Sequence, residues 1–206
     1  MAERKHGIPA PETDSTVYTE DWDREIGERD RHDRVAFIGL DLCETTLDGV
    51  KFESCTFRNA RFNCSTLRDV AFVNCTFVGC NFFEARFTDC KLVGSMFDRC
   101  SFEIMEVDGG DWSFVGLPGA DLSSATLTGV RMREVDLTGA RCQGAVLRDV
   151  DLSGAWLHSA DLSRADLRGS DLSALDPTTS EIRQAIITAE QAVVLAIALG
   201  VQVRDI

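Results

Sequence analysis

Apolar residues recur at every fifth position along most of the chain. The row begins at Phe37 and ends at Leu172, and all 28 of its positions are apolar. An α-helix repeats about every 3.6 residues and a strand every 2, so neither produces a strict five-residue period over this length. A fixed internal period is typical of stacked repeat architectures. The pattern therefore predicts a solenoid over residues 35–174.

A second row, mostly of small residues, lies two positions before each apolar one. It includes Cys55, Ala60 and Ser65 and, near the end, Ala165 and Ser170. If each five-residue unit is one side of a square coil, both rows point to the axis, and residues n and n+20 stack. Stacked strands are about 4.8 Å apart, so about seven coils rise roughly 34 Å. The sequence thus predicts an all-β solenoid filled by stacked side chains.

The two halves of the repeat fill this axis with different residues. Ten of the 14 apolar positions from 37 to 102 are Phe, whereas ten of those from 107 to 172 are Leu and none is Phe. The change falls at residues 105–119, the least regular part of the repeat. We interpret it as a packing adjustment between two kinds of core. A functional kink is the alternative.

Five of the eight cysteines belong to the small inward row: Cys55, Cys75, Cys80, Cys90 and Cys100. Cys55 and Cys75 are 20 residues apart, as are Cys80 and Cys100, so each pair is expected to stack on adjacent coils. A disulfide is geometrically conceivable there. Small buried hydrophobic residues that stay reduced in the cytosol are the favoured interpretation.

The segments on either side of the repeat lack its period. Residues 1–19 are polar and contain two prolines, which predicts a disordered tail. Residues 20–34 keep a faint trace of the frame and are expected to cover the first coil, with Trp22 and Ile26 over its open edge. After residue 174 the pattern ends, and Asp176-Pro177 is expected to break the coil.

Residues 175–206 are predicted to form a helix and a short strand. Thr188 and Gln191 have the spacing of a capping box, and Gly200 follows Leu199 as a stop signal. The helix is apolar on nearly all sides, so both faces need cover. One face can close the core, and a second copy of the chain is the economical partner for the other. The candidate interface residues are Ala192, Val193, Val194, Leu195, Ala196, Ile197 and Leu199. The sequence does not say whether Ala192, Leu195, Ala196 and Leu199 or Val193, Val194 and Ile197 face the partner.

The chain is strongly acidic, with 34 Asp and Glu against 21 Lys and Arg and a net charge of −13. This balance argues against a direct nucleic-acid interaction through phosphate-neutralising groups, and it can attract basic partners. Residues 105–174 hold eleven acids against six bases, and residues 35–104 hold nine against seven. The negative charge is therefore biased toward the C-terminal half of the repeat.

Catalytic and metal-binding patterns are not found. None of the three histidines lies near a cysteine at metal-ligand spacing, and no CxxC occurs. A solenoid wall offers no pocket to shift the pKa values of its aspartates. We therefore expect no enzyme, no catalytic residue, no metal and no cofactor. Residues 1–14 have no apolar run, and the longest one, residues 192–199, is too short to span a bilayer, which predicts no membrane partner and a cytoplasmic protein.

Individual units resemble the pentapeptide-repeat family, whose consensus is a small residue, Asp or Asn, Leu or Phe, a polar residue and Gly. Residues 120–124 (ADLSS) and 165–169 (ADLRG) match it almost letter for letter. The resemblance implies a right-handed quadrilateral parallel β-helix.

The ending of the chain adds a narrower resemblance. An unbroken repeat with an irregular middle coil, followed by ITAEQAVVLAIALG at residues 187–200, is similar to the quinolone-resistance branch of the family, the MfpA and Qnr types. This implies a homodimeric rod that imitates duplex DNA, binds DNA gyrase, and modulates it or protects it from fluoroquinolones or a natural gyrase poison. The candidate gyrase-facing acids are Glu106, Asp108, Asp111, Asp121, Glu134, Asp136, Asp151, Asp161, Asp166 and Asp171. A rigid scaffold or adaptor for an unrelated protein is the alternative.

Overall fold

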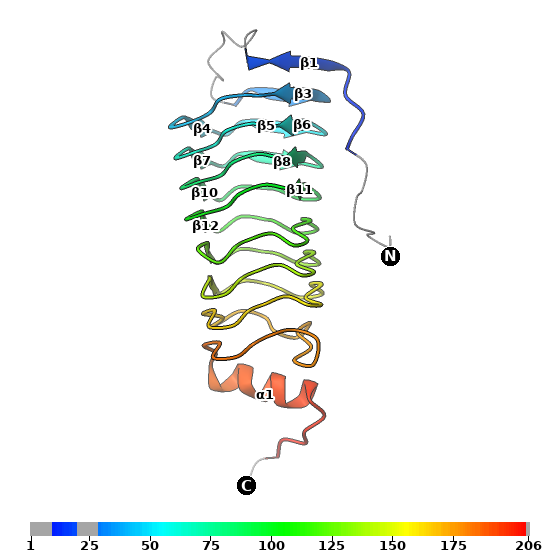
Figure 1. The fold of residues 1–206 in the computed structure, drawn as a ribbon, viewed down its shortest axis with the longest axis vertical. Helices are drawn as coiled ribbons and strands as arrows, with labels where there is room; N and C mark the ends of the chain where they lie inside the picture. Colours follow the sequence, from blue (N-terminus) through cyan, green and yellow to red (C-terminus); the bar gives the residue numbers. More distant parts are fainter. Residues whose placement is uncertain (1–9, 20–28, 205–206) are drawn as a thin grey trace.

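The computed structural model describes residues 10–19 and 29–204. In these residues the chain winds into a parallel β-solenoid whose coils stack along one long axis, and one helix lies beyond the last coil (Figure 1). The predicted all-β solenoid with a short C-terminal helix is therefore confirmed.

Short parallel strands form three sides of the coil. One sheet contains β1 (Ser15–Tyr18), β3 (Val35–Ile38), β6 (Thr56–Arg58), β9 (Thr76–Val78) and β11 (Met96–Asp98). A second contains β4 (Thr46–Asp48), β7 (Thr66–Arg68), β10 (Arg86–Thr88), β12 (Glu106–Asp108), β13 (Thr126–Thr128) and β14 (Val146–Arg148). A third contains β2 (Arg31–Asp33), β5 (Lys51–Glu53) and β8 (Ala71–Val73). Single β-bridges form the fourth side, with Asp41, Arg61, Asn81 and Ser101 in one series and Asp121, Arg141, Asp161 and Glu181 in another.

Every one of these pairings has a register of 20 residues. Phe37 pairs with Phe57, and Phe57 pairs with Phe77. Four five-residue units thus make one turn, as the period predicts. The corners need a left-handed backbone, which glycine and asparagine adopt at lower cost than other residues. Gly79 (φ 64°) and Asn74 (φ 53°) occupy such corners.

The axial row forms the core. From Phe37 to Leu172 its members are at most 6% exposed. In the N-terminal half the rings stack directly over one another, with centroids 5.0 Å apart for Phe37 and Phe57 and 4.9 Å apart for Phe57 and Phe77. Neighbouring columns of rings meet edge to face, a favourable arrangement for aromatic pairs. The core is therefore a continuous column of stacked side chains.

The backbone ladder is interrupted once along the bridged side. The two coils before the interruption are joined normally on this side. The N–H of Phe82 donates to the Ser101 carbonyl (2.9 Å), and the N–H of Ser101 donates to the Cys80 carbonyl (3.1 Å). Among the described residues, no backbone hydrogen bond joins residues 98–104 to residues 118–124. The N–H of Ile104 instead donates to Ser124 Oγ (3.0 Å). We call this interruption, residues 98–104 and 118–124, the seam.

The seam lies where phenylalanine gives way to leucine in the core. The rings of Phe62 and Phe82 are 4.8 Å apart, whereas those of Phe82 and Phe102 are 5.7 Å apart. Leu122 occupies the next position in this column. The looser stacking at the seam fits the packing adjustment that the sequence predicts beside residues 105–119.

Both ends of the solenoid extend further than the sequence analysis predicts. Residues 15–18 form β1, which pairs in register with β3, so this part of the supposed disordered tail is ordered by backbone hydrogen bonds. At the other end the N–H of Glu181 donates to the Ala160 carbonyl, and that of Ile186 donates to the Ala165 carbonyl (2.9 and 2.8 Å). The coil therefore continues past Asp176-Pro177 instead of stopping there. Residues 1–9, Trp22 and Ile26 lie outside the described residues.

Helix α1 (Ala189–Ala198) closes the C-terminal end. The predicted capping box is present, because Thr188 Oγ1 accepts from the Gln191 N–H and Gln191 Oε1 accepts from the Thr188 N–H. Gly200 follows in a left-handed conformation (φ 80°). Residues 201–204 form no strand, so the predicted short final strand is wrong. No described helix is long and apolar enough to cross a membrane.

Candidate protein-binding surface

The aspartates that precede axial leucines build the turns of the coil. Asp121 Oδ1 accepts from the backbone N–H of Ser123 (3.1 Å) and from its hydroxyl (2.7 Å). Asp161 makes the same two contacts with Ser163. Aspartate side chains commonly mimic a backbone turn in this way. These carboxylates therefore have a structural role that the charge pattern alone does not reveal.

Many of these acids also face an arginine on an adjacent coil. Arg141 donates to Asp121 Oδ2 at 2.9 Å, and Arg131 pairs with Asp111 at 3.3 Å. The further ion pairs between coils within the described residues are Arg34 with Asp14, Arg61 with Asp41, Arg86 with Glu106, Arg133 with Asp151, and Arg148 with Asp166. Such pairs at a surface contribute little to stability, but they partly cancel the negative charge that a partner would meet.

Hydrogen bonds lower the pKa of several of these carboxyls. The hydroxyl of Ser123 has the largest effect on the pKa of Asp121, followed by Arg141, and both favour its charged form. For Asp111, burial raises the pKa, but the hydrogen bonds from Ser113 and the charge of Arg131 outweigh this effect, and the net direction is down. These side chains are therefore ionised at neutral pH and already engaged within the chain.

The structure divides the predicted acidic residues into three groups. Glu106, Asp108, Asp121, Glu134 and Asp171 are exposed, and Asp111, Asp151 and Asp161 are half-buried. Asp136 (4% exposed) and Asp166 (9% exposed) are buried, so their prediction as outward, partner-facing residues is wrong. Asp166 is enclosed by Arg148 and Arg168. Asp136 Oδ1 accepts the N–H of Thr138 (2.9 Å) and belongs to the wall.

Two exposed predicted acids, Asp108 and Glu134, make neither an ion pair nor a side-chain hydrogen bond within the described residues. Asp171 is also exposed and without an ion pair there, but its Oδ1 accepts the Ser173 N–H (2.8 Å). Among the exposed acids that were not predicted, Asp89 and Asp149 likewise make no ion pair within the described residues. The sequence did contain a signal for them, because Asp69, Asp89 and Asp149 occupy equivalent corner positions 20 or 60 residues apart, in register with one another.

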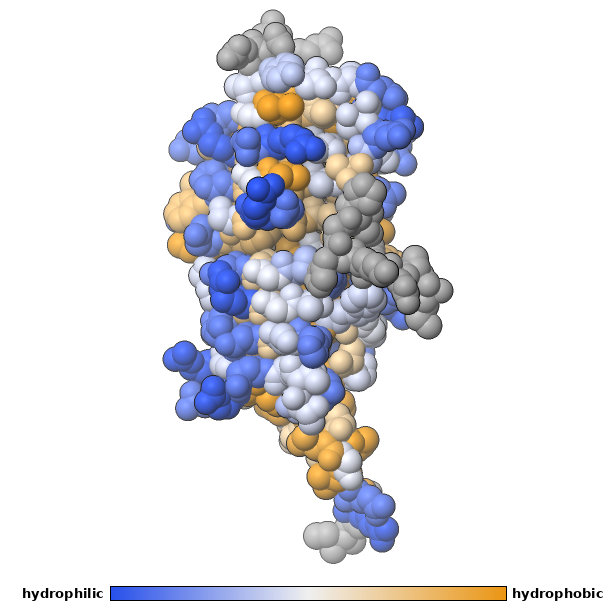
Figure 2. Space-filling model, turned by 45° about the vertical axis from the view of Figure 1, so that its right-hand side comes forward, coloured by the Kyte–Doolittle hydropathy of each residue, from blue (hydrophilic) through white to orange (hydrophobic). Residues whose placement is uncertain are grey.

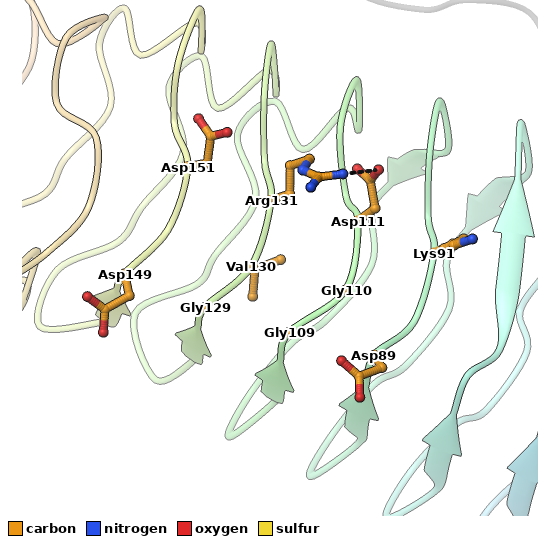
Figure 3. A pocket seen from close by; sticks show the side chains of 10 residues that line it. All are labelled: Asp89, Lys91, Gly109, Gly110, Asp111, Gly129, Val130, Arg131, Asp149 and Asp151. Carbon is orange, nitrogen blue, oxygen red and sulfur yellow. Dashed lines mark hydrogen bonds and ion pairs between the residues drawn. The ribbon is translucent and has the colours of Figure 1, made fainter.

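Asp89 and Asp149 border a shallow hollow of about 650 Å³ on the outer wall. Figure 3 shows Lys91, Asp111, Arg131 and Asp151 in one row along the solenoid, with Asp89 and Asp149 on the other side of the hollow. Glycines line the hollow between them: Gly109, Gly110 and Gly129. An added Cβ at Gly110 would lie 2.2 Å from the Cys90 carbonyl oxygen, so only glycine fits there. The hollow is open and mixed in charge, and it is not an enzyme-like cleft.

Helix α1 presents a second candidate surface. Leu195 (8% exposed) packs on the core, and the Gln191 amide donates to the carbonyls of Leu167 and Ser170 (both 2.7 Å). Ala192, Val193, Val194, Ile197 and Leu199 are exposed, and Ala196 is half-buried. Leu195 is therefore wrong as an interface residue, because it closes the core. Hydrophobic residues gather at this end of the molecule in Figure 2, below a largely hydrophilic wall.

No group of three or more His, Cys, Asp or Glu side chains within the described residues is arranged to hold a metal ion. The buried Cys90 and Cys142 thiols have pKa values raised by burial, to about 11 and about 12, which makes them poor nucleophiles at neutral pH.

Comparison with known proteins places the fold in a family. A family model described as a pentapeptide repeat region matches residues 50–119. A second one, described as pentapeptide repeats in eight copies, matches residues 117–154 and 136–173. The chain belongs to the pentapeptide-repeat family. A search of curated protein sequences gave no match.

A solved structure shows the same architecture. The chain is similar to a trypsin-treated variant of QnrB1, a plasmid-mediated fluoroquinolone resistance protein, with 22% identity, a TM-score of 0.50, and coverage of 94% of this chain and 97% of that one. It is also similar to HetL, a pentapeptide-repeat protein involved in heterocyst differentiation regulation in the cyanobacterium Nostoc (18% identity, TM-score 0.36, 82% and 91% coverage).

Proposed function

We propose that the protein is a non-catalytic binding protein that engages DNA gyrase at its DNA-binding surface and modulates it or protects it from fluoroquinolones or a natural gyrase poison. The observation that carries the proposal is the free acidic set, which we define as Asp89, Asp108, Glu134 and Asp149. These carboxylates are exposed on the corners and faces of a straight rod with a net charge of −13. The likeness in fold to a fluoroquinolone resistance protein supports the choice of partner.

Electrostatics decide which acids matter for such a contact. Asp121 and Asp161 use one carboxylate oxygen for a turn, and their second oxygen faces Arg141 or Gln143. The charge of Asp121 is therefore partly neutralised before a partner arrives, and both oxygens of Asp161 are already engaged in hydrogen bonds. Asp108 and Glu134 have no such partner among the described residues, so they attract a basic surface at full strength. Interactions of this kind mainly accelerate association and weaken over a Debye length of about 8 Å at physiological salt.

A matched pair of variants tests this assignment. The first carries Asp108→Asn and Glu134→Gln, and the second carries Asp121→Asn and Asp161→Asn, with the same loss of two charges. We expect the first to bind immobilised gyrase with a clearly slower association rate and the second to differ less from the original chain. Equal loss in both variants would refute the role of the free acidic set, although it would leave gyrase as the partner.

Gyrase itself is tested by a supercoiling assay with and without ciprofloxacin, titrated with the protein. We expect relief of the drug's inhibition, or inhibition of supercoiling, at concentrations where binding occurs. Excess linear DNA should displace the protein. Absence of binding, or binding that persists unchanged at saturating DNA and high salt, would overturn the proposal.

We also propose that the exposed side of α1 joins two copies of the chain end to end. Val193 (41% exposed), Ile197 (60%) and Leu199 (56%) form an apolar surface beyond the last coil. Exposed apolar surface of this kind is typical of a contact site. Ile197→Glu should convert a dimer into a monomer in light scattering, whereas Gln184→Glu, on an exposed corner of the last coil, should not. An unchanged dimer in Ile197→Glu would remove the helix as the interface.

A further inference from the structure

Two pairs of cysteine thiols stack on adjacent coils inside the solenoid. Cys55 and Cys75 form one pair, and Cys80 and Cys100 form the other. The register of the second pair is fixed by the bridge between Asn81 and Ser101 and by the Ser101 N–H to Cys80 carbonyl bond (3.1 Å). Paired strands are about 4.8 Å apart. That spacing lies within the range of about 4.4–6.8 Å that separates the Cα atoms of a disulfide.

The two pairs differ in access to solvent. Cys55 (0% exposed) and Cys75 (1%) are closed on both sides by the regular ladder. Cys80 is equally buried at 1%, but Cys100 is half-buried. Cys100 lies on the edge of the seam, where the ladder to the next coil is missing. Cys100 is therefore the one member of the two pairs that is not fully buried, and we expect a small reagent to reach this pair first.

We propose that Cys80 and Cys100 form a reversible oxidation site, at which a low-molecular-weight disulfide converts the stacked thiols into an intrachain disulfide between adjacent coils. The proposal is independent of gyrase binding and of dimerisation.

The reaction balances in two exchange steps. The thiols contact each other, which lowers the pKa of Cys80 and raises that of Cys100, so the pair titrates as a unit and, once one proton is lost, keeps the other on Cys100. Exchange at the less buried sulfur requires this proton to pass from Cys100 to Cys80. The Cys100 thiolate so formed attacks the reagent RS–SR, forms Cys100–S–SR and releases RS⁻. The Cys80 thiol then gives its proton to a thiolate and attacks the Cys100 sulfur, which expels the second RS⁻. The two thiols are oxidised by two electrons, and RS–SR is reduced to two RSH.

The Cys80–Cys100 disulfide would link the coil that contains Cys100, the last one before the seam, to the preceding coil, which contains Cys80. Without the disulfide, opening of the seam would expose Phe102, because residues 98–104 make no backbone hydrogen bond to residues 118–124. With the disulfide, the segment from Cys80 to Cys100 becomes a closed loop, which restricts the unfolded chain and slows local opening. Oxidation should therefore raise the unfolding midpoint, and a reductant should restore the original value.

The test treats the full-length native protein with oxidised glutathione, blocks free thiols, and maps tryptic peptides by mass spectrometry. A Cys80–Cys100 disulfide joins residues 69–86 to residues 100–131, whereas a Cys55–Cys75 disulfide joins residues 52–58 to residues 69–86. We expect the first product, with loss of two thiols and about 2 Da relative to the reduced protein. It should appear well before the second, and the thermal midpoint should rise as it forms.

Alanine variants control for folding, because Ala60 and Ala120 already occupy this inward column. Cys80→Ala should leave a mixed disulfide on Cys100, and Cys100→Ala should abolish reaction at both positions. Cys55→Ala should change neither. Mixed disulfides confined to Cys43 and Cys64 on the outer wall, or a Cys55–Cys75 bond formed as fast as the Cys80–Cys100 bond, would overturn the proposal.

Discussion

At the scale of single residues, the place of a side chain within the five-residue unit decides its energetic role. Phe77 is fully buried and stacks on Phe57 and Phe97, with centroids 4.9 and 4.6 Å away. Phe77→Ala removes these contacts and leaves a cavity in a column that cannot collapse sideways, so it should cost about 3–5 kcal/mol. Urea unfolding measures this loss.

The control for Phe77 must be a truly exposed residue. The five-residue frame predicts that Thr76 points outward, but Thr76 is only 9% exposed and so is unsuitable. Thr46 on β4 is exposed, and Thr46→Ala should change the free energy of unfolding by less than about 0.5 kcal/mol. Similar losses at positions 46 and 77 would contradict the division into axial and outward sites.

Glycine corners differ in a way that only the contacts reveal. Gly110 and Gly119 both have positive φ (88° and 67°). A Cβ at Gly119 meets nothing within 4 Å, whereas a Cβ at Gly110 meets the Cys90 backbone. Gly119→Ala should therefore cost only the backbone strain, about 1–2 kcal/mol. Gly110→Ala should cost clearly more, and equal unfolding midpoints for the two variants would count against the observed packing.

At the scale of elements, helix α1 depends on one amide. Gln191 accepts from the Thr188 N–H through Oε1 and donates to the Leu167 and Ser170 carbonyls through Nε2. Gln191→Glu keeps the acceptor but removes both donors and places a charge in a buried site. We expect α1 to detach from the last coil, with faster amide hydrogen exchange over residues 189–198.

Thr188→Ala provides the comparison, because it removes the cap without disturbing the contacts of Gln191 Nε2. It should cost about 1 kcal/mol. If the backbone amides of residues 189–198 exchanged no faster in Gln191→Glu than in Thr188→Ala, the side-chain amide of Gln191 would not hold the helix to the solenoid.

At the scale of the whole molecule, the turn aspartates link stability to pH. Their contacts lower the pKa of Asp121 and Asp161, mainly through the hydroxyls of Ser123 and Ser163, from the ordinary value of 3.8. A depressed folded-state pKa contributes stability that is present above pH 3.8 and is lost as the pH falls through the lower, folded value. The urea concentration at the unfolding midpoint should therefore decrease once the pH is lowered below about 4.

Asparagine keeps the turn acceptor but does not titrate in this range. The double variant Asp121→Asn, Asp161→Asn should therefore show a smaller decrease in the urea concentration at the unfolding midpoint between about pH 7 and about pH 3 than the original chain. A loss as large as that of the original chain would show that other groups govern acid unfolding.

The architecture follows from the amino-acid sequence alone, because the residues at every fifth position from Phe37 to Leu172 are all apolar and all have to be buried. A five-residue apolar period has one geometrical solution, the stacked coil, and the capping box at Thr188 is equally local. The remaining features depend on neighbours 20 residues away, which the local pattern does not describe. Asp136 and Asp166 look like surface acids until the coils above and below cover them, and Glu181 and Ile186 extend the solenoid by bonding to the coil before them. The seam and the incomplete burial of Cys100 arise in the same way, since both depend on whether two particular coils meet closely enough to complete their hydrogen bonds.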